Sequence, residues 1–211
     1  MILILSANAI RPNGLVSRDM DNIPSSEDLM IRIAEGDQNA FEILVNRHQT
    51  FILNLVYRFM GDRTQAKDLA QDVFLRVWQG AKGYRPDAKF TTWIYRIAAN
   101  LCLNELKSAR RKNWFSFRHT TEDTDNTLEE TLPDKSPSAE DLLLTKERSR
   151  QISEALQSLP ANQRMALVLK RYDDLPYEEI ARIMDCSVSA VESLLVRAKK
   201  ALQEKLKNFE K

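Results

Sequence analysis

Residues Asp68–Arg111 read DLAQDVFLRVWQGAKGYRPDAKFTTWIYRIAANLCLNELKSARR, and the rest of the chain is organised around this stretch. Its first part places Leu69, Val73 and Val77 at helical spacing, with carboxylates and amides between them. A polar loop with Gly and Pro follows. A second helical segment then begins among aromatic residues and ends in Asn, Lys and Arg. The stretch therefore predicts two amphipathic helices joined by a polar loop.

The composition of the chain favours helix nearly throughout. Its 211 residues include only five Gly, and Leu, Ala, Glu, Lys, Arg and Gln outnumber β-branched residues. Periodicity and capping residues predict helices over about 26–35, 39–60, 65–79, 92–112, 139–159, 160–172, 177–184 and 188–205. Thr91 or Thr92 is the expected cap of the fourth helix. The fold class that we expect is all-α.

The expected helices fall into two small domains, a size that the length allows. We predict a disordered N-terminal extension over residues 1–24, within which Met20 is an alternative start, a first domain over 25–112 and a second over 139–211. Residues 113–138 are polar, acidic and interrupted by two prolines, so they are predicted to form a flexible acidic linker.

The net charge of +1 hides two basic clusters. One contains Lys107, Arg110, Arg111, Lys112 and Arg118, and the other contains Arg197, Lys199, Lys200, Lys205 and Lys207. Six carboxylates between residues 122 and 134 offset them in the sum. A nearly neutral chain can therefore still present two surfaces to DNA.

Several function classes lack their signatures. Cys102 and Cys186 form no CxxC pair and are expected to pack as small apolar residues in a cytoplasmic protein. No metal-ligand spacing, phosphate loop or catalytic motif is present, so we expect neither cofactor nor enzymatic activity. The apolar start MILILSANAI lacks a basic n-region, and no segment approaches a membrane span.

The C-terminal part has the pattern of a helix-turn-helix. A short helix over 177–184, a tight turn at 185–187 and a longer helix from Val188 share apolar positions, with small Ala181 allowing close approach. Periodicity alone leaves other tight helical hairpins open. The basic residues that follow favour DNA binding.

Three blocks carry a family resemblance: DLAQDVFLRVW at Asp68–Trp78, FTTWIYRIAANLCLNEL at Phe90–Leu106, and LPYEEIARIMDCSVSAVESLLVRAKKAL at Leu175–Leu202. In order and spacing the chain resembles an extracytoplasmic-function (ECF, group 4) sigma factor of the sigma-70 family, in its sigma-E-like branch. The resemblance implies that region 2 binds the β′ clamp helices of core RNA polymerase and recognises the −10 element. Region 4 would bind the β flap and read the −35 element of the promoter DNA.

The resemblance assigns core-polymerase binding to five residues of the first block: Asp68, Gln71, Asp72, Phe74 and Arg76. Acceptors at i, i+3 and i+4 suit basic and polar groups on a partner helix. Without the resemblance, these carboxylates would pass for ordinary surface charge. Leu69, Val73 and Val77 are interpreted as core.

The loop over 83–92 resembles the family's specificity loop, which captures a flipped −10 base. Its expected pocket residues are Tyr84, Asp87 and Lys89, and the rings of Phe90, Trp93 and Tyr95 lie close by in sequence, although Phe90 and Trp93 also suit a core. The following helix is expected to contact −10 DNA through Arg96, Asn100, Asn104, Lys107, Arg110 and Arg111.

The second domain is expected to contact −35 DNA through Lys170, Arg171, Ser187, Ser189, Ala190, Glu192, Ser193, Val196, Arg197 and Lys200. Many relatives carry a basic residue where this chain has Glu192, so the −35 consensus of those relatives is not transferred to this chain.

An anti-sigma factor is a further expected partner. The alternatives are a helix-turn-helix regulator without polymerase contacts and, more remotely, a nucleic-acid enzyme. The Asp68–Trp78 block discriminates against the regulator, which has no use for it.

Overall fold

The computed structural model describes residues 24–86, 89–115 and 139–207, with side chains absent from the description at 110–115 and 139–146. Residues 1–23 of the expected N-terminal extension, residues 116–138 of the expected linker and Asp87 lie outside the described residues. Within them all regular structure is helical, in two groups, which confirms the all-α expectation. No helix there is long and apolar enough to cross a membrane.

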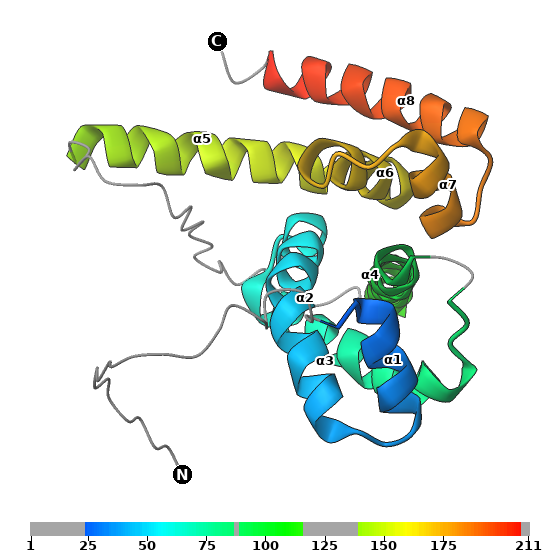
Figure 1. The fold of residues 1–211 in the computed structure, drawn as a ribbon. Coiled ribbons are helices and arrows are strands. Elements are labelled where there is room, and N and C mark those ends of the chain that lie inside the picture. Colours follow the sequence, from blue (N-terminus) through cyan, green and yellow to red (C-terminus); the bar gives the residue numbers. More distant parts are fainter. Residues whose placement is uncertain (1–23, 87–88, 116–138, 208–211) are drawn as a thin grey trace, which may run out of the picture.

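The first group contains α1 (Ser26–Ala34), α2 (Gln38–Met60), α3 (Arg63–Gly80), the 3₁₀ turn η1 (Ala81–Gly83) and α4 (Phe90–Phe115) (Figure 1). Side-chain caps set the starts of the first three helices. Ser25 and Asp28 form a capping box, Asp37 accepts from the Ala40 N–H, and Asp62 accepts from the Gln65 N–H. These local signals explain why their starts could be predicted.

The second group contains α5 (Ala139–Gln157), α6 (Ala161–Tyr172), α7 (Tyr177–Met184) and α8 (Val188–Leu206). Asp185 has φ 53°, a left-handed conformation that Asp tolerates, and it turns the chain sharply between α7 and α8. The Ser187 hydroxyl then caps α8 by accepting from the Ala190 N–H. The predicted helix-turn-helix is confirmed.

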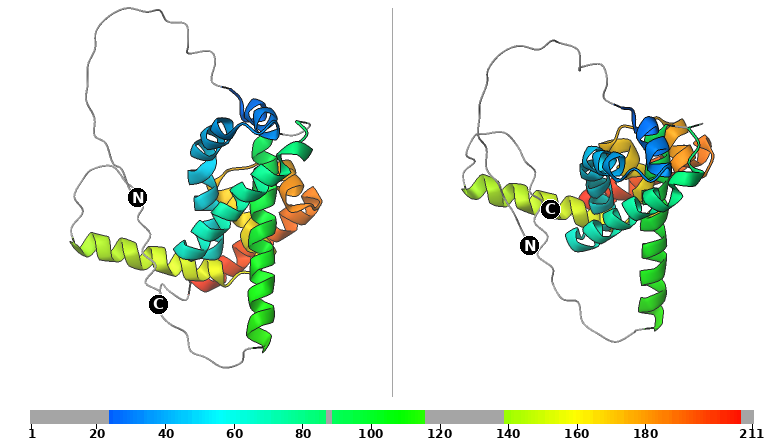
Figure 2. Two further views of the ribbon diagram at one scale, coloured as in Figure 1. Left: turned by 90° about the horizontal axis from the view of Figure 1, so that it is seen from below. Right: turned by 60° about the horizontal axis from the view of Figure 1, so that its bottom comes forward.

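The two groups pack against each other. Helices α6 and α7 lie across α2 and α4 (Figure 1), and the views from other sides keep α6 and α7 beside the first turns of α4 (Figure 2). One buried cluster joins them, because Leu169 and Ile180 of the second group share it with Phe59 and Ile94 of the first. Burial of these apolar side chains is the main term that holds the groups together.

Three expectations about local structure are wrong. Helix α4 begins at Phe90, so neither Thr91 nor Thr92 caps it; the carboxylate of Glu27 in α1 accepts from the Phe90 N–H at 2.7 Å and supplies the cap from another helix. Phe51, whose spacing with Leu44, Leu55 and Val56 predicts a place on the apolar face of α2, is 60% exposed, and Val188, whose spacing with Val191 and Leu195 predicts a place in the core, is 37% exposed. Helical spacing cannot tell which apolar residues find a covering element.

Candidate nucleic-acid and polymerase interfaces

The expected core residues of α3 and most of its expected polymerase contacts lie on different faces of the helix. Leu69, Val73 and Val77 are buried, as predicted. The five expected contact residues do not all share one environment: Asp68, Gln71, Asp72 and Arg76 are exposed, whereas Phe74 is buried. Phe74 therefore offers a partner at most the edge of its ring.

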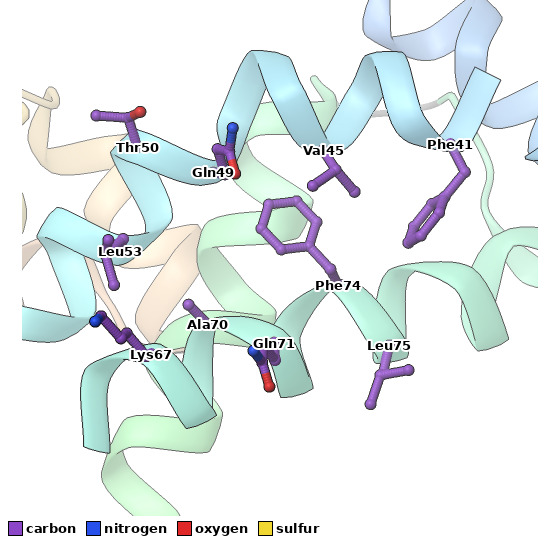
Figure 3. Close-up of a pocket in the computed structure, with 10 residues that line it drawn as sticks. All are labelled: Phe41, Val45, Gln49, Thr50, Leu53, Lys67, Ala70, Gln71, Phe74 and Leu75. Carbon is purple, nitrogen blue, oxygen red and sulfur yellow. The ribbon is translucent and has the colours of Figure 1, made fainter. Parts of the chain in front are cut away.

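Phe74 borders an apolar groove between α2 and α3, with a volume of about 710 Å³. Figure 3 shows the Phe74 ring pointing from α3 toward Val45 and Gln49 of the facing α2, with Phe41 farther along that helix. Leu75, which is 55% exposed, adds an apolar side chain to the groove's lining. The groove was not predicted from the sequence, although Leu75 lies outside the core spacing of its helix and was the available signal.

The expected base-capturing loop is attached to the first group by aromatic contacts. The Tyr84 ring centroid lies 5.1 Å from that of Trp93 and 6.2 Å from that of Phe90. Burial raises the pKa of the Tyr84 phenol, and the Glu27 carboxylate raises it further. Phe90 is fully buried, so its interpretation as core is confirmed. Lys89 is exposed beside this cluster.

The polar residues of α4 form one exposed row. Arg96, Asn100, Asn104 and Lys107 recur at helical spacing, and each is exposed. Arg110 and Arg111 lie in the same helix, but their side chains are outside the described part. Tyr95, named with the available rings, is buried against the second group and presents no face for stacking here. The row itself can offer amides to base edges and cations to phosphates.

The start of α8 carries most of the residues expected at the −35 element. Ser187, Ser189, Glu192, Ser193, Arg197 and Lys200 are exposed, Val196 is 69% exposed and Ala190 is half-buried. Ser187 and Ser189 also contact each other through their hydroxyls at 3.1 Å. These side chains form an exposed strip on the helix, polar except at Ala190 and Val196.

The two basic residues at the end of α6 differ in availability. The Lys170 ammonium donates to the Asp174 carboxylate at 2.9 Å and to the Leu175 carbonyl at 3.3 Å, so it stabilises the turn before α7. Arg171 is exposed. Of the two, Arg171 is better placed to reach a phosphate.

Comparison with known proteins gives two family matches. Residues 44–112 match the model of Sigma-70 region 2, and residues 149–202 match the model of Sigma-70, region 4. The chain is 34% identical over 191 residues to the RNA polymerase sigma-H factor of Pseudomonas aeruginosa, covering 85% of this chain and 93% of that protein. It is 36% identical over 180 residues to the ECF RNA polymerase sigma-E factor of Escherichia coli K12, covering 84% and 92%.

Two solved structures share the fold. CnrH, solved in complex with the cytosolic domain of CnrY, superposes with a TM-score of 0.60 at 24% identity, covering 87% of this chain and 97% of that one. The sigma factor RpoE of Bartonella quintana, solved with the anti-sigma factor NepR, gives a TM-score of 0.61 at 21% identity, covering 79% and 96%. At these identities the comparison shows a shared fold alone.

Proposed function

The chain belongs to the ECF sigma factors of RNA polymerase, and from that premise we propose how its surfaces divide the work of promoter recognition. As a sigma factor it directs promoter-specific transcription by the polymerase. We assign residues 25–112 to region 2 and 139–211 to region 4. The chain supplies recognition and the polymerase supplies catalysis, so it needs no cofactor and acts with the polymerase in the cytoplasm.

The exposed face of α3 docks on the β′ clamp helices. Asp68, Gln71 and Asp72 supply acceptors to basic and polar groups of the partner, and Arg76 one turn later supplies a donor. The apolar groove beside them adds a surface that excludes water, with Leu75 as its exposed contact. Region 4 of the same chain contacts the β flap of the polymerase.

We assign recognition of the −10 element to the exposed row of polar residues on α4. This row is the observation on which the proposed function rests. Asn100 and Asn104 have amides that both donate to and accept from base edges, while Arg96 and Lys107 flank them with positive charge. Arg110 and Arg111 continue the helix toward the phosphates. Tyr84, Asp87 and Lys89 form the base-capturing end.

Helix α8 reads the −35 element from the major groove. Ser189, Glu192 and Ser193 face solvent at its start, and Arg197 and Lys200 follow on the side suited to phosphates. Glu192 accepts from the amino group of cytosine, so we expect a cytosine in the −35 sequence that this chain prefers.

A regulatory partner follows from the same assignment. CnrH was solved with the cytosolic domain of CnrY, and the Bartonella RpoE with the anti-sigma factor NepR. We infer that this chain also has an anti-sigma factor, which restrains it until its promoters are needed.

Run-off transcription with purified core polymerase on genomic promoter fragments tests the proposed function. Transcripts that depend on the added chain, together with its retention by core polymerase in a pull-down, are expected. A chain that binds duplex promoters by itself but is not retained by core would instead be a helix-turn-helix regulator, and the sigma assignment would fail.

A further inference from the structure

The apolar groove between α2 and α3 is lined by side chains of the first group alone. Six of them are apolar: Phe41, Val45, Leu53, Ala70, Phe74 and Leu75. The groove has a volume of about 710 Å³. Pockets that hold small ligands usually measure about 300–1,000 Å³. Because Leu75 is 55% exposed, an apolar chain segment in the groove would remove further apolar surface from water.

The surface beside the groove is polar, and it is acidic along α3. Four polar residues complete the lining: Gln49, Thr50, Lys67 and Gln71. Asp68 and Asp72 are exposed on α3, two turns and one turn before Leu75 on the same face of the helix. An occupant that fits is therefore apolar where it enters the groove and basic where it passes these carboxylates.

The first residues of the chain have this composition. Residues 1–5 read MILIL, and residues 1–18 contain Arg11 and Arg18 but no carboxylate. The other long segment outside the described residues, 116–138, contains six carboxylates, and the carboxylates of α3 would repel it. Charge thus favours the N-terminal segment over the linker as the occupant.

The N-terminal segment can reach the groove. The Ser26 hydroxyl lies 2.8 Å from His48 Nε2 and accepts from Arg47 Nη1 at 3.2 Å, so α1 starts against the middle of α2. Gln49, the next residue of α2, lines the groove. A path around α2 has to pass one helix, about 10–12 Å across with its side chains. Residues 6–23 form the tether, and a flexible chain of that length spans roughly 20–25 Å.

We propose that residues 1–5 of this chain dock in the α2–α3 groove, with Arg11 toward Asp68 and Asp72, and compete there with core polymerase. Segments predicted to be disordered, as residues 1–24 are, can order on docking. A tether of this kind gives an effective concentration on the order of millimolar, so a contact that would be weak for a free peptide suffices.

The competition rests on the proposed function of α3. The segment offers apolar side chains to the groove and a cation to the carboxylates, which is the chemistry expected of the polymerase partner. A docked segment therefore covers the surface that the β′ clamp helices need. The apparent affinity for core polymerase falls by the fraction of time for which the groove is free.

Two double substitutions test the proposal. Leu3→Asn/Leu5→Asn replaces two apolar side chains with polar ones, whereas the matched control Leu3→Met/Leu5→Met keeps them apolar. Neither pair changes the net charge. A chain that starts at Met20 lacks the segment and should behave as the Asn pair does. Circular dichroism checks that all these proteins have the helix content of the wild type.

Cross-linking measures docking without polymerase. Ser6→Cys, beside the apolar run, is combined with Gln49→Cys or Lys67→Cys at the groove, in a Cys186→Ser background. The control combines it with Asn54→Cys, at an exposed position on another face of α2. A short bifunctional maleimide should join Ser6→Cys to at least one groove position about tenfold faster than to the control position.

The Leu3→Asn/Leu5→Asn pair should remove this difference in rate, and the Leu3→Met/Leu5→Met pair should keep it. Equal rates at the groove and control positions with the wild-type segment overturn the proposal. Products that join two chains would place the segment in the groove of a second copy, which overturns docking within one chain.

Binding to core polymerase tests the competition. Leu3→Asn/Leu5→Asn and the chain that starts at Met20 should bind core about tenfold more tightly than Leu3→Met/Leu5→Met, the ratio expected if the groove is free about a tenth of the time. Equal affinities overturn the competition. If no version binds core, the sigma assignment fails and the competition with it, while cross-linking still decides whether the segment docks.

Discussion

The Glu27 carboxylate accepts a hydrogen bond from the Phe90 backbone N–H at 2.7 Å, across 63 residues of sequence. Helix α1 thereby caps α4, the helix that carries the −10 assignment. The bond fixes where α4 starts and how the loop before it enters. The −10 surface therefore depends on α1, which contributes none of the predicted DNA contacts.

Glu27→Ala should destabilise the first group by about 1 kcal/mol, the usual cost of a lost helix N-cap. Glu42→Ala, which removes an exposed carboxylate from α2, is the control and should change stability little. Urea unfolding of both variants measures the difference. Equal stabilities would show that the α1 cap contributes nothing in solution.

Stability should fall as the pH drops below about 6.5, in part through His48. Burial lowers the pKa of this imidazole, the Arg47 charge lowers it further and Glu27 opposes both; His48 Nε2 lies 2.8 Å from Ser26 Oγ. The unfolded chain binds the proton more readily, so the stabilisation is present above the unfolded pKa and is lost as the pH falls through the folded one. His48→Gln should flatten this part of the profile between pH 7.5 and 5, measured by denaturant unfolding. A slope unchanged by the substitution contradicts the assignment.

Gly61→Ala should lower stability more than Gly36→Ala. Both glycines have positive φ, 80° and 95°, so both substitutions carry a backbone penalty of about 1–2 kcal/mol. A Cβ at Gly61 would also lie 2.7 Å from Gln157 Nε2, whereas a Cβ at Gly36 would meet nothing within 4 Å. The excess for Gly61→Ala, read from thermal unfolding, measures the contact between α2 and α5. No excess would mean that Gln157 moves aside freely.

Asp72→Lys should weaken binding to core polymerase by about tenfold, because it replaces an acceptor in the predicted contact with a cation. Glu35→Lys makes the same charge change at an exposed position outside α3 and should bind as the wild type does. Competition for core polymerase against a labelled wild-type chain gives the ratio. Equal weakening in both variants would point to net charge and not to this face.

Asn100→Ala should reduce promoter opening by about tenfold at unchanged core affinity, because one exposed amide of the α4 row is lost. Permanganate footprinting across −10 variants of a transcribed promoter measures opening. Unaltered footprints would remove Asn100 from the reading row.

Local chemistry explains what the sequence determined. Capping residues and apolar spacing act within one or two turns, so the helix-turn-helix over 177–205 and the caps at Ser25 and Asp62 could be found without tertiary information. The exposed row on α4 was predictable for the same reason, since residues one turn apart must share a face. The roles given to these residues came from the family resemblance.

Contacts between distant residues decided the rest. The start of α4 depends on Glu27, the burial of Tyr95 depends on the second group, and the groove beside Phe74 depends on how α2 and α3 pack together. Apart from the exposed Leu75 beside the groove, these features have no local signal, because desolvation and hydrogen bonding between helices depend on which faces meet in space. Sequence thus determined which helices form and which side chains share a face, while the tertiary structure alone decided which faces are covered.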